Sequence, residues 1–267
     1  VCSKDPANKK THPQPVLRKR VFMQLAFKKA VTDAIKKQPD RRVMPFLYEN
    51  EPYFIKRRLS NHRNRFAKQS VDAAFWCEVY KILTVNQYGP MAPEIVLLHD
   101  DYFVMKAVGK TLQGVAKEAP WQDVRRKAFY KAGEALGKLH GFGLHHGRPA
   151  LRDIAYDREK DSVTLLDWEN EKRFIDADPR VIDLFLFVHS CFREKWALKN
   201  DELIREAMKG YFTGPESRPI LEKALAVTKR FQAAFTLAHH LRIFGWTDVT
   251  SLDDARNYLF QLDPDAL

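Results

Sequence analysis

The spacing of hydrophobic positions along this chain of 267 residues predicts strands and helices in the first half and almost continuous helix in the last third. Apolar stripes at helical spacing predict helices over residues 21–37, 71–85 and about 122–140. The same spacing continues near the C-terminus. It predicts helices there over about 181–197, 201–212, 217–243 and 252–261.

Short β-prone runs lie between the early helices. Residues 45–48 and 53–56 flank a polar turn at 49–52 and predict a β-hairpin. Further strands are expected near 95–98 and 102–108. The run "SVTLLDWEN", residues 162–170, is expected to be a short buried strand that delivers Asp167 at its end.

The order of these elements predicts an α+β fold in two lobes. Residues 1–20 are polar, basic and proline-bearing, and they predict a flexible arm. A small strand-rich N-lobe is expected over residues 21–108 and a larger helical C-lobe over residues 109–267. No internal repeat or low-complexity segment interrupts this organisation.

Composition narrows the class of protein. Hydrophobic residues make up 45% of the chain and charged residues 30%, which is typical of a protein with a buried core. The longest apolar run, residues 181–189, contains Asp183 and is too short to span a bilayer, and no signal peptide is visible. The three cysteines are scattered without a CxxC pair, which argues against a disulfide framework and structural zinc. We therefore expect a cytoplasmic protein.

The formal net charge of +11 favours anionic partners. A surface that is basic only for solubility is the alternative. The helix over 21–37 carries many lysines, so it either docks on its own domain or lies on an anionic membrane as a peripheral contact. The basic run 56–68 either faces phosphorylated sugar or lipid head groups or is a solvated loop. No nucleic-acid-binding module is recognisable, which argues against nucleic acid as the partner.

Residues able to carry chemistry follow one another in a defined order. Lys56 ends an apolar strand, and Glu78 lies on the next helix. The loop "HHGRPALRDIAY", residues 145–156, then holds His146, Arg148 and Asp153. Asp167 follows at a strand end, and Asp183 lies in the hydrophobic start of a helix.

These motifs resemble those of the protein-kinase-like superfamily, and most closely its aminoglycoside-phosphotransferase and lipopolysaccharide-core-kinase branches. Those branches carry H-G-D-x-x-x-x-N, then D-W-E or D-F-E, then D-P-x-x-D-L. The corresponding residues here are His146-Gly147-Arg148 with Asp153, then Asp167-Trp168-Glu169, then Asp178-Pro179 before Asp183-Leu184. The resemblance covers roughly residues 44–190 and implies a two-lobed protein-kinase-like fold.

The resemblance implies phosphotransfer that depends on ATP and Mg²⁺. Lys56 would hold the nucleotide phosphates and pair with Glu78, and the hinge that grips adenine would include Met105 and Val108. Mg²⁺ would be bound by Asp167 together with Asp153, which stands where the family has asparagine. Asp183 would brace the loop through backbone N–H groups.

The resemblance also implies an acceptor, namely an anionic sugar or lipid of the bacterial envelope, such as lipopolysaccharide core, at the cytoplasmic face of the membrane. The positive charge is in keeping with such an acceptor.

Two departures from the family pattern bear on activity. Arg148 stands where the family has its loop aspartate, and residues 1–88 contain no glycine, so a glycine-rich phosphate loop is absent. A guanidinium cannot accept a proton at working pH. In one interpretation the protein is a pseudokinase that binds a nucleotide or a partner. In the other it is active, with His146 or Asp153 taking the acceptor proton while Arg148 holds negative charge.

Overall fold

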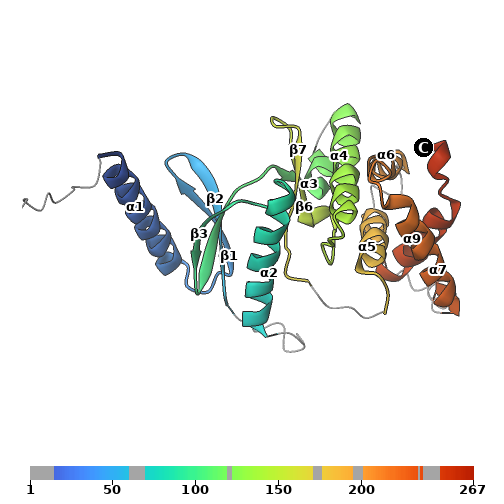
Figure 1. Ribbon diagram of the computed structural model, residues 1–267, viewed down its shortest axis with the longest axis horizontal. Coiled ribbons are helices and arrows are strands. Elements are labelled where there is room, and N and C mark those ends of the chain that lie inside the picture. The colour runs from blue at the N-terminus through green and yellow to red at the C-terminus, as the bar shows by residue number, and fades with distance from the viewer. Residues whose placement is uncertain are drawn as a thin grey trace, which may run out of the picture. The chain divides into compact units, whose positions relative to one another are not determined.

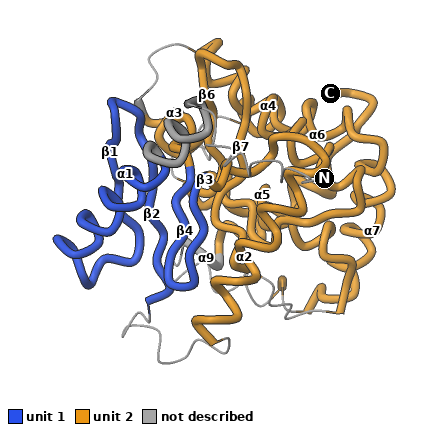
Figure 2. Tube along the Cα trace, turned by 60° about the vertical axis from the view of Figure 1, so that its left-hand side comes forward, with its two compact units in different colours: residues 1–61, 96–105 blue, residues 62–95, 106–267 orange. Residues whose placement is uncertain are grey.

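The computed structural model divides into two compact units, coloured separately in Figure 2. Unit 1 comprises residues 1–61 and 96–105, and unit 2 comprises residues 62–95 and 106–267. The structure describes residues 15–59, 70–118, 122–170, 176–194, 201–233, 235–236 and 247–267. The arm predicted at 1–20 and the basic run 56–68 therefore lie largely outside the described residues.

Unit 1 is an antiparallel sheet with one long helix beside it (Figure 1). The helix is α1 (Pro15–Lys37), and the sheet order is β1-β2-β4-β3. The strands are β1 (Val43–Tyr48), β2 (Glu51–Arg57), β3 (Ile95–His99) and β4 (Tyr102–Lys106). The α+β class is thus confirmed, and the predicted hairpin is β1 paired with β2.

The hairpin turn is tighter than the sequence predicts. Pairing continues to Tyr48 and Glu51, so only Glu49 and Asn50 form the loop. Both have positive φ, 50° and 65°, as a two-residue turn that matches the twist of the strands requires. The expected four-residue turn was too wide because side-chain polarity does not reveal backbone pairing.

The core of unit 1 joins α1 to the sheet. Val31 of α1 is fully buried against Met44 and Ile55. Phe27 adds edge-on ring contacts with Phe46 and Tyr53, with centroids 5.8 Å and 5.2 Å away. The apolar stripe predicted over 21–37 therefore docks on its own sheet.

Unit 2 holds the remaining helices and a second antiparallel sheet of order β5-β6-β7. The strands are β5 (Lys110–Thr111), β6 (Ile154–Asp157) and β7 (Ser162–Leu165). Among the described residues, its α-helices are α2 (Val71–Val85), α3 (Leu112–Glu118), α4 (Gln122–Gly141), α5 (Pro179–Arg193), α6 (Asp201–Tyr211), α7 (Ser217–Arg230) and α9 (Thr247–Gln261). Short 3-10 turns lie at η1 (Asn86–Tyr88), η2 (Leu151–Asp153) and η5 (Pro264–Ala266).

Sequence and structure agree best where helical stripes are long. The range of α2 matches the prediction, because Ser70 caps it by accepting a hydrogen bond from Ala73 N. Strand β6 was not predicted, since the residues from Ile154 were assigned to the loop. Its register with β7 pairs Ile154 with Leu165. The strand is buried by tertiary contacts, and four residues are too few to show a period.

Helices α4 and α6 approach closely because glycines line their contact. A Cβ atom added at Gly133 would lie 1.7 Å from the carbonyl oxygen of Ala207, and one at Gly210 would lie 1.9 Å from that of Tyr130. Backbones at this separation leave no room for a side chain. Helices α4 and α6 lie side by side in unit 2 and form its most extensive contact between two elements (Figure 1).

Within the described part of the chain, no helix has both the length and the apolar character needed to cross a membrane.

We predict that Gly133→Ala lowers the free energy of unfolding by about 2 kcal/mol or more, because the clash is with backbone that cannot rotate away. Gly114→Ala in α3 is the matched control, since its nearest neighbour is a flexible carbon of the Lys110 side chain at 3.1 Å. That control should be neutral or gain up to about 1 kcal/mol in helix propensity. Urea unfolding followed by circular dichroism measures both, and an equal loss in the two variants would contradict the prediction.

Candidate functional site

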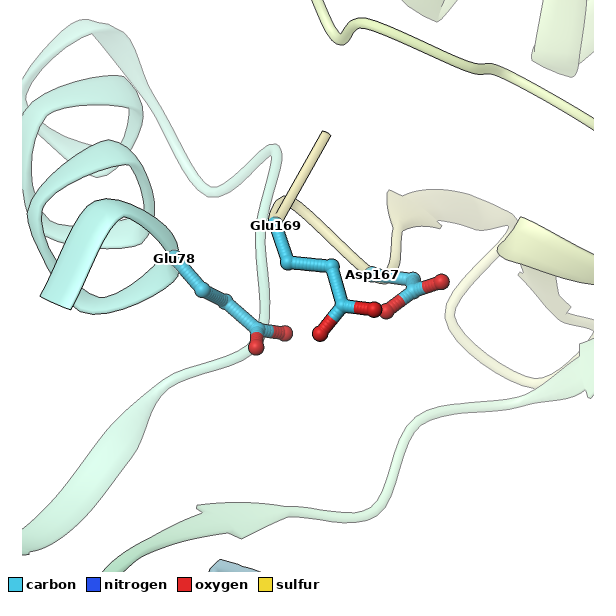
Figure 3. Close-up of side chains that lie close together, drawn as sticks. All are labelled: Glu78, Asp167 and Glu169. Carbon is cyan, nitrogen blue, oxygen red and sulfur yellow. The ribbon is translucent and has the colours of Figure 1, made fainter. Parts of the chain in front are cut away.

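Three carboxylates of unit 2 converge at one point (Figure 3). Glu78 extends from α2, while Asp167 and Glu169 come from the segment after β7. One oxygen from each lies within 4.8 Å of the other two. Like charges so close repel one another unless a cation is present. Carboxylate oxygens are the ligands that hard cations such as Mg²⁺ prefer, so this donor set suits such an ion.

The segment after β7 is fixed by backbone pairing and by one buried ring. Leu166 N donates to the carbonyl oxygen of Asp153 at 2.7 Å, beside the β6–β7 ladder. Trp168 is fully buried, and its Nε1 donates to the carbonyl of Leu165 at 2.8 Å. With Trp168 directed into the core, its two acidic neighbours reach the cluster together.

Asp167 has an unusual backbone conformation. Its φ is +62°, in the left-handed region that residues with a Cβ atom rarely adopt. Such strain persists only where surrounding structure imposes it, and it gathers at functional sites. Glu49, Asn50 and Asp161 also have positive φ, so the conformation of Asp167 marks a sharp bend of the backbone after β7.

The loop 145–156 is anchored from below by Asp183 of α5. Its two carboxylate oxygens accept hydrogen bonds from the backbone N–H groups of His146 and Gly147. Burial by itself would raise the pKa of Asp183, but hydrogen-bonding and charge interactions with His140 and His146 bring the pKa below its usual value. The expected bracing role of Asp183 is confirmed by these hydrogen bonds.

His146 links the loop to the segment that carries Asp167. Its Nε2 donates to the carbonyl of Leu166 at 2.7 Å, while its Nδ1 accepts from Arg148 N at 3.3 Å. Burial lowers the pKa of His146, so the ring is neutral. With both nitrogens engaged inside the protein, His146 is placed to position Asp167. It has no ring nitrogen left to take a proton from an acceptor, which was the role considered from the sequence.

Gly147 holds the loop tightly against Asn170. Its φ is +103°, and a Cβ atom there would lie 2.1 Å from the carbonyl oxygen of Asn170. The same carbonyl accepts a hydrogen bond from Lys81 Nζ at 2.9 Å. Lys81 lies one turn after Glu78 on α2, so this buried lysine ties the helix to the strained segment.

Arg148 points at the acidic residues. Its Nη2 lies 3.0 Å from Asp167 Oδ2 and 3.6 Å from Asp153 Oδ2. The side chain is 37% exposed. Among the described residues, no acceptor lies within hydrogen-bonding distance of Arg148 Nε, although that atom is buried. The guanidinium thus neutralises two aspartates and still holds an unused donor.

Asp153 ends the turn η2 and is 6% exposed. Burial first, and then the negative charge of Asp167, raise the pKa of Asp153 to about 6 in spite of Arg148 and Arg152 nearby. At neutral pH this carboxylate is therefore mostly ionised, but it takes up a proton far more readily than an exposed aspartate.

The structure thus brings together five of the predicted residues: Glu78, His146, Arg148, Asp153 and Asp167. It also adds Glu169, to which the sequence analysis gave no role. The signal was present, because Glu169 lies two residues after Asp167 in the same D-W-E motif. Asp153 is not among the three converging carboxylates and instead faces Asp167 across Arg148.

The remaining predicted site residues, Lys56, Met105 and Val108, belong to other segments of the chain. Lys56 is a buried residue of β2, and Met105 lies on β4, both in unit 1. Val108 follows β4 and belongs to unit 2. Their contribution to nucleotide binding stays a prediction from the sequence.

Comparison with known proteins finds a similar protein but no family. The chain is 28% identical over 230 residues to an uncharacterized protein of Haemophilus influenzae. The aligned region covers 85% of this chain and 93% of that protein. No family model matches the chain.

We predict that Asp153→Asn stabilises the metal-free protein at neutral pH. The native carboxyl has a pKa of about 6 against an ordinary value of 3.8, so the folded state binds more protons between these values. The native free energy of unfolding therefore falls as pH rises from about 4 to about 6, whereas the amide does not titrate. The advantage of the variant should be absent near pH 4 and reach the order of 1 kcal/mol above pH 6.

Urea unfolding in the presence of a chelator, between pH 4 and 7.5, tests this prediction. Glu159→Gln is the control, because Glu159 is an exposed residue in the turn between β6 and β7. A constant difference between native protein and Asp153→Asn across that range would show that Asp153 does not titrate as proposed.

Proposed function

We propose that this protein is a kinase-like phosphotransferase that uses ATP and Mg²⁺. The observation that carries the proposal is the joining of the loop 145–156 to the carboxylate cluster. Asp183 braces the backbone of the loop, His146 connects it to Leu166, and Asp167 is held beside it in a strained conformation. Phosphoryl transfer depends mostly on positioning and on cations, and this arrangement provides for both.

Mg²⁺ fits the site by the chemistry of its donors. Asp167 and Glu169 would hold the ion, with Glu78 as the third carboxylate, and all three offer oxygen atoms. When bound, the ion would neutralise the phosphate oxygens during transfer. The protein's own part is to keep the three carboxylates together, which the buried Trp168 and the capped helix α2 do.

Asp153 is the group best suited to take the proton of an acceptor hydroxyl. Its raised pKa, about 6, places it near the range where a general base is effective. Arg148 beside it would orient negative charge on the acceptor or on the moving phosphoryl through its side chain, which is 37% exposed. Arginine favours such oxygens because its fork matches their geometry.

The acceptor that we propose is an anionic sugar or lipid of the bacterial envelope, such as lipopolysaccharide core. The family resemblance and the net charge of +11 support this class, and the proposed site of action is the cytoplasmic face of the membrane.

A second candidate function is binding without turnover, as in a pseudokinase. The observation in its favour is the ion pair between Arg148 and Asp167. The guanidinium neutralises negative charge of Asp167 that a metal ion would otherwise neutralise. Such a protein would bind a nucleotide or a partner at the same site. Turnover of ATP therefore separates the two candidates.

We predict that ATP with Mg²⁺ stabilises the native protein, by about 2.7 kcal/mol at 100 times the dissociation constant, and that Asp167→Asn removes this gain. Thermal unfolding with ATP, with and without Mg²⁺, measures the effect. The control Glu159→Gln removes a charge from the same unit but should keep the full shift.

An equal shift in native protein and Asp167→Asn would show that the metal is bound elsewhere. If both the control and the native protein shift, ATP turnover with envelope sugars and lipids as acceptors follows. A nucleotide-dependent shift without any turnover would identify the binding-only function.

A further inference from the structure

Arg148 occupies the position between two aspartates where an acidic site would ordinarily hold a cation. One nitrogen, Nη2, approaches both Asp167 and Asp153, at 3.0 Å and 3.6 Å. Asp153 is buried, and the same guanidinium nitrogen pairs with the carboxylates of both residues. Two carboxylates in this arrangement need a positive charge between them, and the chain itself supplies it.

The carboxylates therefore fall into two groups that share Asp167. At one end Asp167 and Asp153 face the guanidinium, and at the other end Asp167 converges with Glu78 and Glu169. Repulsion between a divalent ion and Arg148 would oppose a second ion at the first end, because the two positive charges would compete for the same oxygens.

We infer that the guanidinium of Arg148 takes the place of a divalent metal ion between Asp153 and Asp167. The site would then bind one metal ion, at Glu78, Asp167 and Glu169, and no second ion between the two aspartates. The inference rests on the proposed function, since it assumes the metal at Glu78, Asp167 and Glu169. A fixed guanidinium makes one of the site's three positive charges independent of the metal concentration. The Arg148 side chain is also 37% exposed, so its guanidinium can donate hydrogen bonds to an anionic ligand as well.

The test is the number of Mn²⁺ ions bound per chain, counted by electron paramagnetic resonance in the presence of a non-hydrolysable ATP analogue. Native protein should bind one ion, and Arg148→Gln should bind two, with the affinity of the second rising at least tenfold over native. Arg148→Lys keeps the charge and should still bind one. Circular dichroism and thermal unfolding verify that each variant is folded.

Arg152→Gln is the matched control. Arg152 also pairs with Asp153, Nε to Oδ1 at 3.6 Å, but no ion pair joins it to Asp167 among the described residues. Losing this arginine should leave the count at one, because the position between the two aspartates remains filled by Arg148.

Two ions in the native protein, or one in a folded Arg148→Gln, would overturn the inference and leave the proposed function standing. If Arg148→Gln does not fold, the native count and that of Arg148→Lys decide, since two ions in either would overturn it. No bound Mn²⁺ in native protein, with or without the nucleotide analogue, would overturn both the inference and the proposed metal site.

Discussion

The candidate site depends on the carboxylate of Asp183. The two oxygens of this buried side chain accept hydrogen bonds from the backbone N–H groups of His146 and Gly147. A buried carboxylate is costly unless its oxygens are satisfied, and a buried N–H group is costly unless it has an acceptor. Each therefore stabilises the other, and the loop is held to α5 at the point where its backbone turns through Gly147.

From that anchor, a chain of contacts leads to the carboxylates. His146 holds the Leu166 carbonyl, and the next residue, Asp167, is in the left-handed region. Asp153 O accepts from Leu166 N at 2.7 Å, so the loop and the strand end are tied from both sides. Strain at Asp167 is maintained because its neighbours are fixed, which keeps the three carboxylates together although they repel one another.

Arg148 changes the chemistry that such a site can perform. An acid at this position could take up a proton, whereas a guanidinium can only hold negative charge. In this structure it pairs with Asp153 and Asp167 at once. Under the proposed function, the proton-accepting role would pass to Asp153, whose pKa is raised to about 6. The replacement of an acid by arginine is thus compatible with activity, provided that a neighbouring carboxylate serves as the base.

The sequence by itself determined the elements with long periodic stripes and the residues with recognisable chemistry. Helix α2 has the predicted range because a serine cap and a regular apolar face are local features. The loop with Arg148 and Asp153, the aspartate that follows β7 and the bracing Asp183 could likewise be named from their order in the chain.

Only the tertiary structure decided how these groups pair. It placed Arg148 between two aspartates, added Glu169 to the cluster, and engaged both nitrogens of His146. Strand β6 also appeared only in three dimensions, because its four residues are held by pairing with β7 rather than by a pattern of their own. Packing sets the distances between side chains of separate elements and the burial that shifts their pKa values. The spacing of residues along the chain does not determine how separate elements pack.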